Sequence, residues 1–95
     1  MQPRKHTKTF TEKVLAVVKT IPSGKVLTYS EVAWKAGNHN AYRAVGNILM
    51  KNFDPKIPCH RVVKSDGDIG EYNRGKAEKL RKLRAEGAKV ALQGK

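Results

Sequence analysis

The sequence predicts a mainly α-helical, small single domain with a helix-turn-helix and a short β-hairpin beside its only cysteine, Cys59. Three observations support this fold class. Apolar residues recur at helical spacing in several stretches. Two short predicted helices are joined by a tight turn at Gly37, as in a helix-turn-helix. An Asp66-Gly67 pair lies between β-prone residues, which is typical of a hairpin turn.

The first predicted helix follows a basic arm. Residues 1–8 carry basic side chains but no acid, and we expect them to be flexible. Thr9 and Glu12 have the spacing of a capping box. The Pro22-Ser23-Gly24 run ends the helix. A helix over residues 10–20 is predicted by apolar residues at helical spacing, namely Phe10, Val14, Leu15, Val17, Val18 and Ile21.

The helix-turn-helix is predicted between residues 25 and 51. Residues 25–29 are β-prone and form an extended connector. Ser30 is expected to cap a helix over 31–36, and Asn40 a second helix over 41–51. The buried face of that second helix is predicted to consist of Ala41, Ala44, Val45, Ile48 and Leu49.

The rest of the domain is predicted to be a hairpin and one further helix. Residues 61–64 and 68–70 are expected to pair across the turn. A helix over 76–86 should direct Ala77, Leu80 and Leu83 inward. We therefore expect one domain over residues 9–88, followed by a flexible tail over 89–95.

The charge of the chain indicates a polyanionic partner. It has 20 Lys and Arg against 8 Asp and Glu, a formal net charge of +12. Nucleic acid is the first candidate, and a lysine-rich solvated surface is the alternative. No apolar run is long enough for a membrane span, and the polar, basic N-terminus lacks a signal-peptide pattern. A single cysteine allows no internal disulfide, and no metal site or cofactor is predicted. These features favour an intracellular protein, cytoplasmic in a prokaryote or nuclear in a eukaryote.

The stretch IPCHRVV at residues 57–63 is the candidate reaction centre. A thiolate is the reactive form of cysteine, and neighbouring cationic or imidazole groups favour it. The alternative is that Cys59 is only a small apolar residue buried in the core. Adjacent residues of a strand point to opposite faces, so Cys59 and His60 can cooperate only through a turn or a bridging water. The carboxylate that would orient the histidine is left open among Glu71, Glu78 and Glu86.

These residues resemble the active-site motif of the O6-alkylguanine-DNA alkyltransferases, the methylated-DNA–protein-cysteine methyltransferases. The resemblance extends over residues 10–88. Besides the cysteine motif, it rests on Phe10, Thr11, Val14, Gly24, Lys25, Val26, Thr28, Tyr29, Arg43, Ala44, Val45, Gly46, Gly70, Tyr72, Gly75, Leu83, Glu86 and Gly87.

The resemblance implies catalytic roles for five residues. Cys59 would accept the alkyl group from guanine O6 in a single turnover. His60 would act as base through a water, oriented by Glu86. Tyr29 would donate a proton toward the leaving guanine, and Asn52 would brace the active-site turn. The interval between Asn52 and Cys59 is shorter than the family usually has, which puts the brace in question.

The resemblance also implies a DNA-binding surface and a substrate pocket. The helix-turn-helix would enter the minor groove, where readout is nearly independent of sequence. The O6 substituent is inaccessible within the duplex, so the damaged base has to flip out of the stack. Arg43 would then fill the space that the base leaves. The other implied DNA contacts are Tyr29, Ala41, Ala44, Gly46, Asn47, Arg61 and Arg74. The implied pocket residues are Val62, Tyr72, Asn73 and Arg74.

Two further departures from the family bear on function. The larger N-terminal domain of the family is absent from this sequence. Arg74 stands where a small residue is usual, so we expect it to narrow the pocket against bulky adducts and to add a phosphate contact.

The partner implied is double-stranded DNA that contains O6-alkylguanine, bound by a monomer. The first alternative is a non-catalytic alkyltransferase-like protein that binds the lesion and flags it for another repair pathway. A helix-turn-helix transcription factor is a third reading, which leaves the cysteine motif unexplained.

Overall fold

The computed structural model describes residues 9–38, 40–66 and 68–88. The predicted arm over 1–8 and tail over 89–95 lie outside these residues. The described elements confirm a mainly α fold, and none of their helices is long and apolar enough to cross a membrane. In chain order they are α1 (Phe10–Lys19), β1 (Leu27–Thr28), α2 (Tyr29–Lys35), α3 (Tyr42–Met50), the 3₁₀ turn η1 (Cys59–Arg61), β2 (Val62–Val63) and α4 (Lys76–Ala85).

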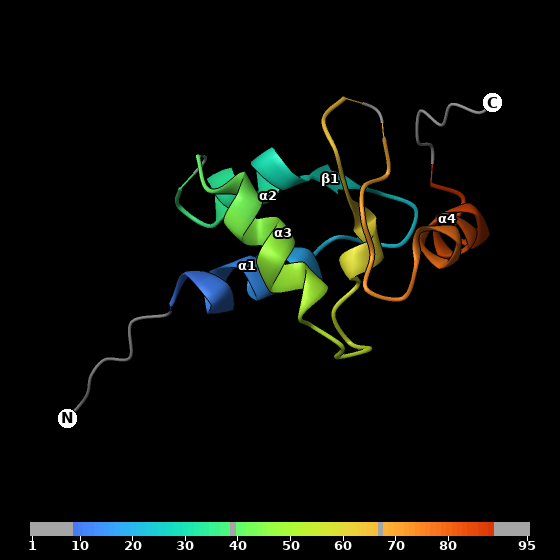
Figure 1. Cartoon of the computed structure of the whole chain (residues 1–95), viewed down its shortest axis with the longest axis horizontal. Coiled ribbons are helices and arrows are strands. Elements are labelled where there is room, and N and C mark those ends of the chain that lie inside the picture. The colour runs from blue at the N-terminus through green and yellow to red at the C-terminus, as the bar shows by residue number, and fades with distance from the viewer. Residues whose placement is uncertain (1–8, 39, 67, 89–95) are drawn as a thin grey trace.

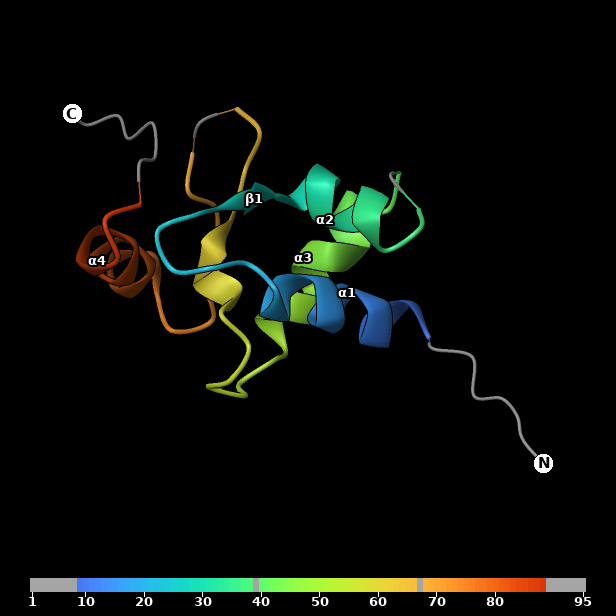
Figure 2. The ribbon, with the colours of Figure 1, turned by 180° about the vertical axis from the view of Figure 1, so that it is seen from behind.

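Helices α1, α2 and α3 pack together at one end of the molecule, and α4 lies at the other (Figures 1 and 2). The segment with η1 and β2 runs between them. Val14, Val32 and Val45, one from each helix of the group, are fully buried in the main core. Cys59 belongs to the same core, whereas Leu83 of α4 packs in a second cluster. The cysteine therefore lies where the helical group meets the rest of the fold.

The first helix confirms the prediction, and the second begins earlier than expected. At α1 the Thr9 hydroxyl accepts from the Glu12 N–H at 3.1 Å, and the Glu12 carboxylate accepts from the Thr9 N–H at 2.9 Å. At α2 the same box is formed by Thr28 and Glu31. The predicted cap at Ser30 is wrong, because Thr28 has a glutamate three residues later and so satisfies two backbone donors.

The third helix begins one residue later than predicted. Its N-cap is Ala41, whose side chain makes no capping bond, so the predicted cap at Asn40 is wrong. Val45 and Leu49 are buried, whereas Ala41, Ala44 and Ile48 are half-buried. The predicted inner face is thus confirmed at its centre.

The predicted hairpin is wrong in its pairing. Strand β2 pairs in parallel with β1, with Leu27 opposite Val62 and Thr28 opposite Val63. One backbone bond, from the Lys64 N–H to the Asp68 carbonyl at 3.0 Å, closes the turn that suggested a hairpin. Val62 and Val63 are both buried, Val62 in the main core and Val63 in the second cluster. The pairing of β1 with β2 holds the connector beside the cysteine turn.

Helix α4 differs from the prediction in which side chains face inward. Leu83 is fully buried and Leu80 is half-buried, but Ala77 is exposed. The inward position one turn before Leu83 is occupied by Lys79, whose exposure is 0%. Residues four apart share a helix face, so a lysine replaces the expected apolar side chain.

Candidate active site

The 3₁₀ turn η1 places Cys59 and His60 side by side in a buried setting. The Cys59 N–H donates to the Ile57 carbonyl at 2.8 Å, and the Arg61 N–H to the Pro58 carbonyl at 2.9 Å. Cys59 is 6% exposed and His60 is 7% exposed. The structure has a turn at this point, and among the described residues no hydrogen bond joins Cys59 Sγ directly to His60.

Glu86 is the carboxylate that contacts the histidine. His60 Nε2 lies 2.8 Å from Glu86 Oε2. Arg61 donates from Nε to Glu86 Oε1 at 2.9 Å and from Nη2 to Oε2 at 2.7 Å. Glu78 instead pairs with Arg81. The open choice among the three glutamates is thereby resolved for this structure.

The charge states of Glu86 and His60 suit a role of His60 as a base. Arg61, with a smaller contribution from His60, holds the pKa of Glu86 down to about 2. Burial lowers the pKa of His60, against the opposing effect of Glu86. The carboxylate can only accept a hydrogen bond, so His60 Nε2 carries the proton. Nδ1 is then the atom that can take up a proton from a neighbour.

Arg61 has an internal role in this arrangement. Besides its two bonds to Glu86, its Nη1 donates to the Ile21 carbonyl at 2.7 Å. These bonds tie the end of α4 to the loop after α1 and fix the Glu86 carboxylate. The DNA contact assigned to Arg61 stays a prediction.

Asn52 braces the cysteine despite the short interval between them. Its Nδ2 donates to Cys59 Sγ at 3.1 Å. Asn73 in turn holds this loop, because its Nδ2 donates to the Asn52 carbonyl at 2.6 Å. Burial raises the pKa of the Cys59 thiol, whereas the Asn52 bond, Lys79 and Arg74 lower it. The resting thiol is therefore protonated at neutral pH, and reaction requires its deprotonation.

Tyr29, at the start of α2, lies on another side of the site. Its hydroxyl donates to the Glu71 carbonyl at 3.4 Å, and burial raises its pKa to about 12. A Cβ on Gly70 would lie 3.0 Å from that hydroxyl, and Gly70 has a φ of +81°. Glycine is thus required here both for space and for conformation.

Lys79 is a site residue that the sequence reasoning missed. Its Nζ donates to the Tyr29 hydroxyl at 3.3 Å and to the Glu71 carbonyl at 3.0 Å. Burial lowers its pKa to about 8. The signal in the sequence was a lysine four residues before Leu83, on the apolar face of α4. Such a lysine is usually solvated through its long stem, which is why the pattern alone did not reveal it.

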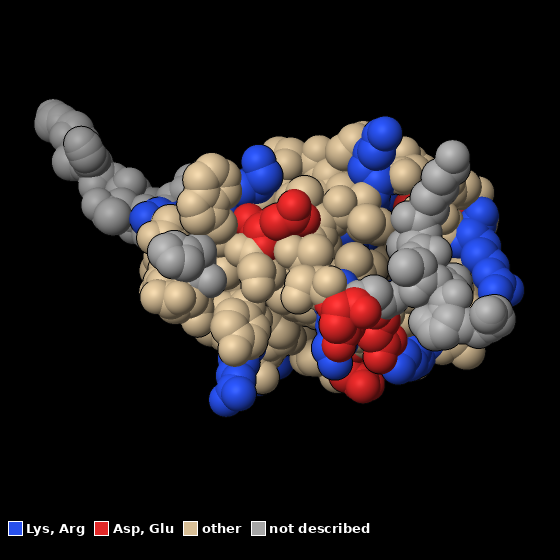
Figure 3. Space-filling model, turned by 90° about the horizontal axis from the view of Figure 1, so that it is seen from above, with Lys and Arg blue, Asp and Glu red and all other residues tan. Residues whose placement is uncertain are grey.

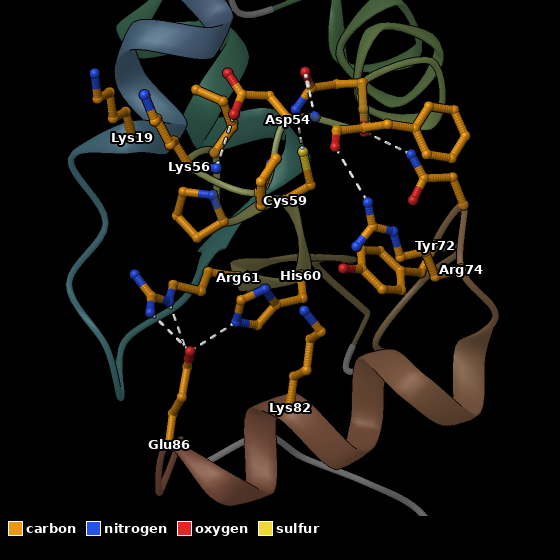
Figure 4. A pocket seen from close by; sticks show the side chains of 16 residues that line it. Lys19, Asp54, Lys56, Cys59, His60, Arg61, Tyr72, Arg74, Lys82 and Glu86 are labelled. Carbon is orange, nitrogen blue, oxygen red and sulfur yellow. Dashed lines mark hydrogen bonds and ion pairs between the residues drawn. The ribbon is translucent and has the colours of Figure 1, made fainter.

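Two cavities meet at Cys59. A cavity of about 320 Å³ is lined by the loop over 52–58, His60, Arg74 and Lys82 (Figure 4). A very small one of about 10 Å³ lies toward Tyr29 and Gly46. Tyr72, Asn73 and Cys59 line both cavities. Val62 is fully buried in the main core and lines neither of them, so its role in a pocket stays a prediction.

The predicted recognition helix α3 presents its polar residues to solvent. Arg43 and Asn47 are exposed, and Gly46 lies against Tyr29. An adjoining hollow of about 520 Å³ runs between α3 and the loop over 64–71. On the face seen in Figure 3, acidic side chains gather in two small groups, with Lys and Arg around them. Lysine partners accompany the acids of that loop, namely Lys64 with Asp66 and Lys76 with Asp68.

The family profile described as the DNA-binding domain of 6-O-methylguanine DNA methyltransferase matches residues 9–88. The chain belongs to this family. The match covers every described element of the fold, including α2, α3 and the Cys59 turn. The resemblance inferred from the motifs is confirmed.

Named relatives within the family agree. The chain is 46% identical over 85 residues to a methylated-DNA–protein-cysteine methyltransferase of Methanothermobacter thermautotrophicus, covering 90% of this chain and 47% of the relative. The structure matches Mycobacterium tuberculosis OGT in complex with DNA with a TM-score of 0.78 and 33% identity, covering 85% of this chain and 50% of the other. The chain thus spans about half the length of these two relatives.

One solved relative is nearer to this chain in length. S. pombe Atl1, solved in complex with damaged DNA containing O6-carboxymethylguanine, matches with a TM-score of 0.73 and 37% identity. The match covers 84% of this chain and 77% of Atl1. This chain therefore matches most of the length of that solved relative.

Proposed function

We propose that this chain takes part in the repair of alkylated DNA by transferring an alkyl group from guanine O6 to Cys59. The observation that carries the proposal is the position of the thiol. Cys59 Sγ accepts a hydrogen bond from Asn52, and the adjacent His60 is paired with Glu86. A nucleophile beside a histidine that a carboxylate orients is the arrangement that cysteine chemistry needs.

In this proposal the Cys59 proton passes to His60 Nδ1 through a bridging water and leaves a thiolate. The sulfur attacks the alkyl carbon, the S–C bond forms as the C–O6 bond breaks, and guanine departs with the bonding electrons. The departing guanine takes up a proton from the Tyr29 side, where Lys79 contacts the phenol at 3.3 Å. A thioether does not revert, so each molecule reacts once.

Binding to DNA is assigned to the α2–α3 unit. The relative from M. tuberculosis and S. pombe Atl1 were both solved with DNA, which supports DNA as the partner of this chain, and we propose that it is double-stranded. Arg43 is exposed on α3, as a residue that fills the space of a flipped base must be. We propose that the chain acts as a monomer inside the cell, where its substrate lies.

The alternative function is recognition of the lesion without transfer. It is supported by the match to S. pombe Atl1, which was solved in complex with damaged DNA containing O6-carboxymethylguanine. In that case the protein would hold O6-alkylguanine for another repair pathway. The intact group of Cys59, His60 and Glu86 favours transfer.

Mass spectrometry after incubation with duplex DNA containing O6-methylguanine tests the proposal. We expect the protein to gain the mass of one methyl group, and Cys59→Ala to gain none. Tight binding to the damaged duplex without a mass gain would support the alternative. Preference for a defined undamaged sequence would overturn both readings.

A further inference from the structure

The 320 Å³ cavity beside Cys59 is rich in cations. Five Lys and Arg side chains line it. Arg61 pairs with Glu86, and the other four lie outside ion-pair distance of every carboxylate among the described residues; they are Lys19, Lys56, Arg74 and Lys82. Two carboxylates also line the cavity. They are Asp54 and Glu86, and Glu86 is already paired with Arg61. The cavity therefore has a surplus of positive charge.

Two of these cations lie close to the reacting groups. Figure 4 shows Lys82 rising from α4 between His60 and Tyr72, and Arg74 beside Tyr72. Arg74 Nη2 donates to the Phe53 carbonyl at 3.1 Å, and its other N–H groups have no hydrogen-bond partner among the described residues, so they can bind an anion. This bond places the guanidinium against the loop that contains Asn52.

The position of the sulfur connects this cavity to the substrate. Cys59, Tyr72 and Asn73 line both the large cavity and the small one toward Tyr29. With guanine on the Tyr29 side, the part of an O6 substituent beyond its reacting carbon can extend into the large cavity. The large cavity, at about 320 Å³, has room for several atoms, because one water occupies roughly 30 Å³.

We propose that the cavity formed around Arg74 and Lys82 accepts anionic O6 substituents, such as carboxymethyl, in preference to neutral ones of the same shape. This inference rests on the proposed function and names its substrate class. A carboxylate there would form charge-assisted hydrogen bonds with Arg74 and Lys82. A neutral substituent would leave the same cations without a partner.

The reaction remains balanced with such a substrate. The sulfur of Cys59 forms a bond to the methylene carbon of the carboxymethyl group as the bond from that carbon to guanine O6 breaks. The thiol proton leaves through His60, and guanine takes up a proton as it departs. The product is S-carboxymethyl cysteine, and no oxidant or reductant takes part.

The test compares two duplexes that differ only in charge. One contains O6-carboxymethylguanine and the other its amide, O6-carbamoylmethylguanine. Because an exposed ion pair contributes at most about 1 kcal/mol, we expect the wild type to favour the acid by roughly fivefold in transfer rate. The preference should fall to about onefold in an Arg74→Gln, Lys82→Gln double variant and remain in Arg74→Lys. Lys13→Gln, on the exposed face of α1, is the matched control and should keep the wild-type ratio.

The same ratio is measured by equilibrium binding with Cys59→Ala, which tests the inference whether or not transfer occurs. If the cations contact DNA phosphates instead, the double variant weakens both duplexes equally and the ratio stays unchanged, which overturns the inference. Equal rates and affinities for the two duplexes in the wild type overturn it as well. Failure to transfer methyl from O6-methylguanine would count against the proposed function alone.

Discussion

Replacing the buried Lys79 by methionine should stabilise the protein. Folding lowers the Lys79 pKa from 10.5 to about 8, because the ammonium is buried. At about 1.4 kcal/mol per pKa unit, keeping this group charged in the folded state costs about 3 kcal/mol at neutral pH. Methionine retains most of the side-chain volume. The Tyr29 hydroxyl and the Glu71 carbonyl still have each other as partners after the change.

The expected gain is about 1–3 kcal/mol in the free energy of unfolding, since two hydrogen bonds to the lysine are lost. The sign of the pH dependence is specific to this residue. Between pH 8 and pH 10.5 the unfolded chain holds the Lys79 proton more tightly than the folded chain does. Wild-type stability should therefore gain from this group as the pH rises through that window, and the variant should lack this gain.

Urea unfolding of the wild type and of Lys79→Met across this window measures both effects. Lys13→Met, an exposed change on α1, should lie within about 0.5 kcal/mol of the wild type at every pH. We expect the Lys79 variant to be the more stable protein and the slower one in alkyl transfer. A variant that is less stable at neutral pH, or a difference that does not change with pH, would refute this reasoning.

Four other predictions concern the candidate site and the proposed reaction. Asn52→Ala should raise the pKa of Cys59 further and move the rate–pH profile of transfer to higher pH, as measured by stopped-flow; an unmoved profile would argue against the brace. Glu86→Gln should lower stability by about 1–3 kcal/mol at neutral pH. That loss should shrink as the pH falls from 4.5 toward 2, where wild-type Glu86 becomes protonated, and denaturant titrations at a series of pH values test this. The wild type should react more slowly with O6-benzylguanine than with O6-methylguanine in duplex DNA, and Arg74→Gly should narrow the gap; comparable wild-type rates would contradict it. Arg43→Ala should slow repair in duplex DNA more than attack on the free base, and equal effects would count against base flipping.

Much of the fold could be predicted because local signals were strong. The Thr9–Glu12 box and the apolar spacing of α1 and α3 are readable from neighbouring residues alone. The strand pairing could not be read in this way. An Asp-Gly pair predicts a local hairpin, whereas the partner of Val62 is Leu27, far away in the sequence. Val62 is fully buried in the main core, and such burial depends on tertiary packing.

Some residues of the candidate site could likewise be predicted from the sequence, and others could not. The cysteine motif is contiguous, so Cys59 and His60 could be found at once, and the family resemblance supplied Glu86 and Tyr29. Lys79 could not be found, because its burial depends on Tyr29 and Glu71 reaching it from other segments. A lysine in a basic helix looks like a solvated charge until its neighbours are known.

The two-residue ladder between β1 and β2 has a consequence for how finely the reaction is aligned. Thr28 on β1 is followed directly by Tyr29, and Val62 on β2 follows the Cys59 turn. A slip of one residue in this ladder would displace the phenol from the sulfur by about 3.3 Å, more than the length of a hydrogen bond. In the proposed reaction, the distance between the Tyr29 phenol and the Cys59 sulfur therefore depends on this two-residue backbone pairing. Substitutions at Leu27 and Val62 should therefore alter this alignment and slow the proposed reaction, while every reactive group stays intact.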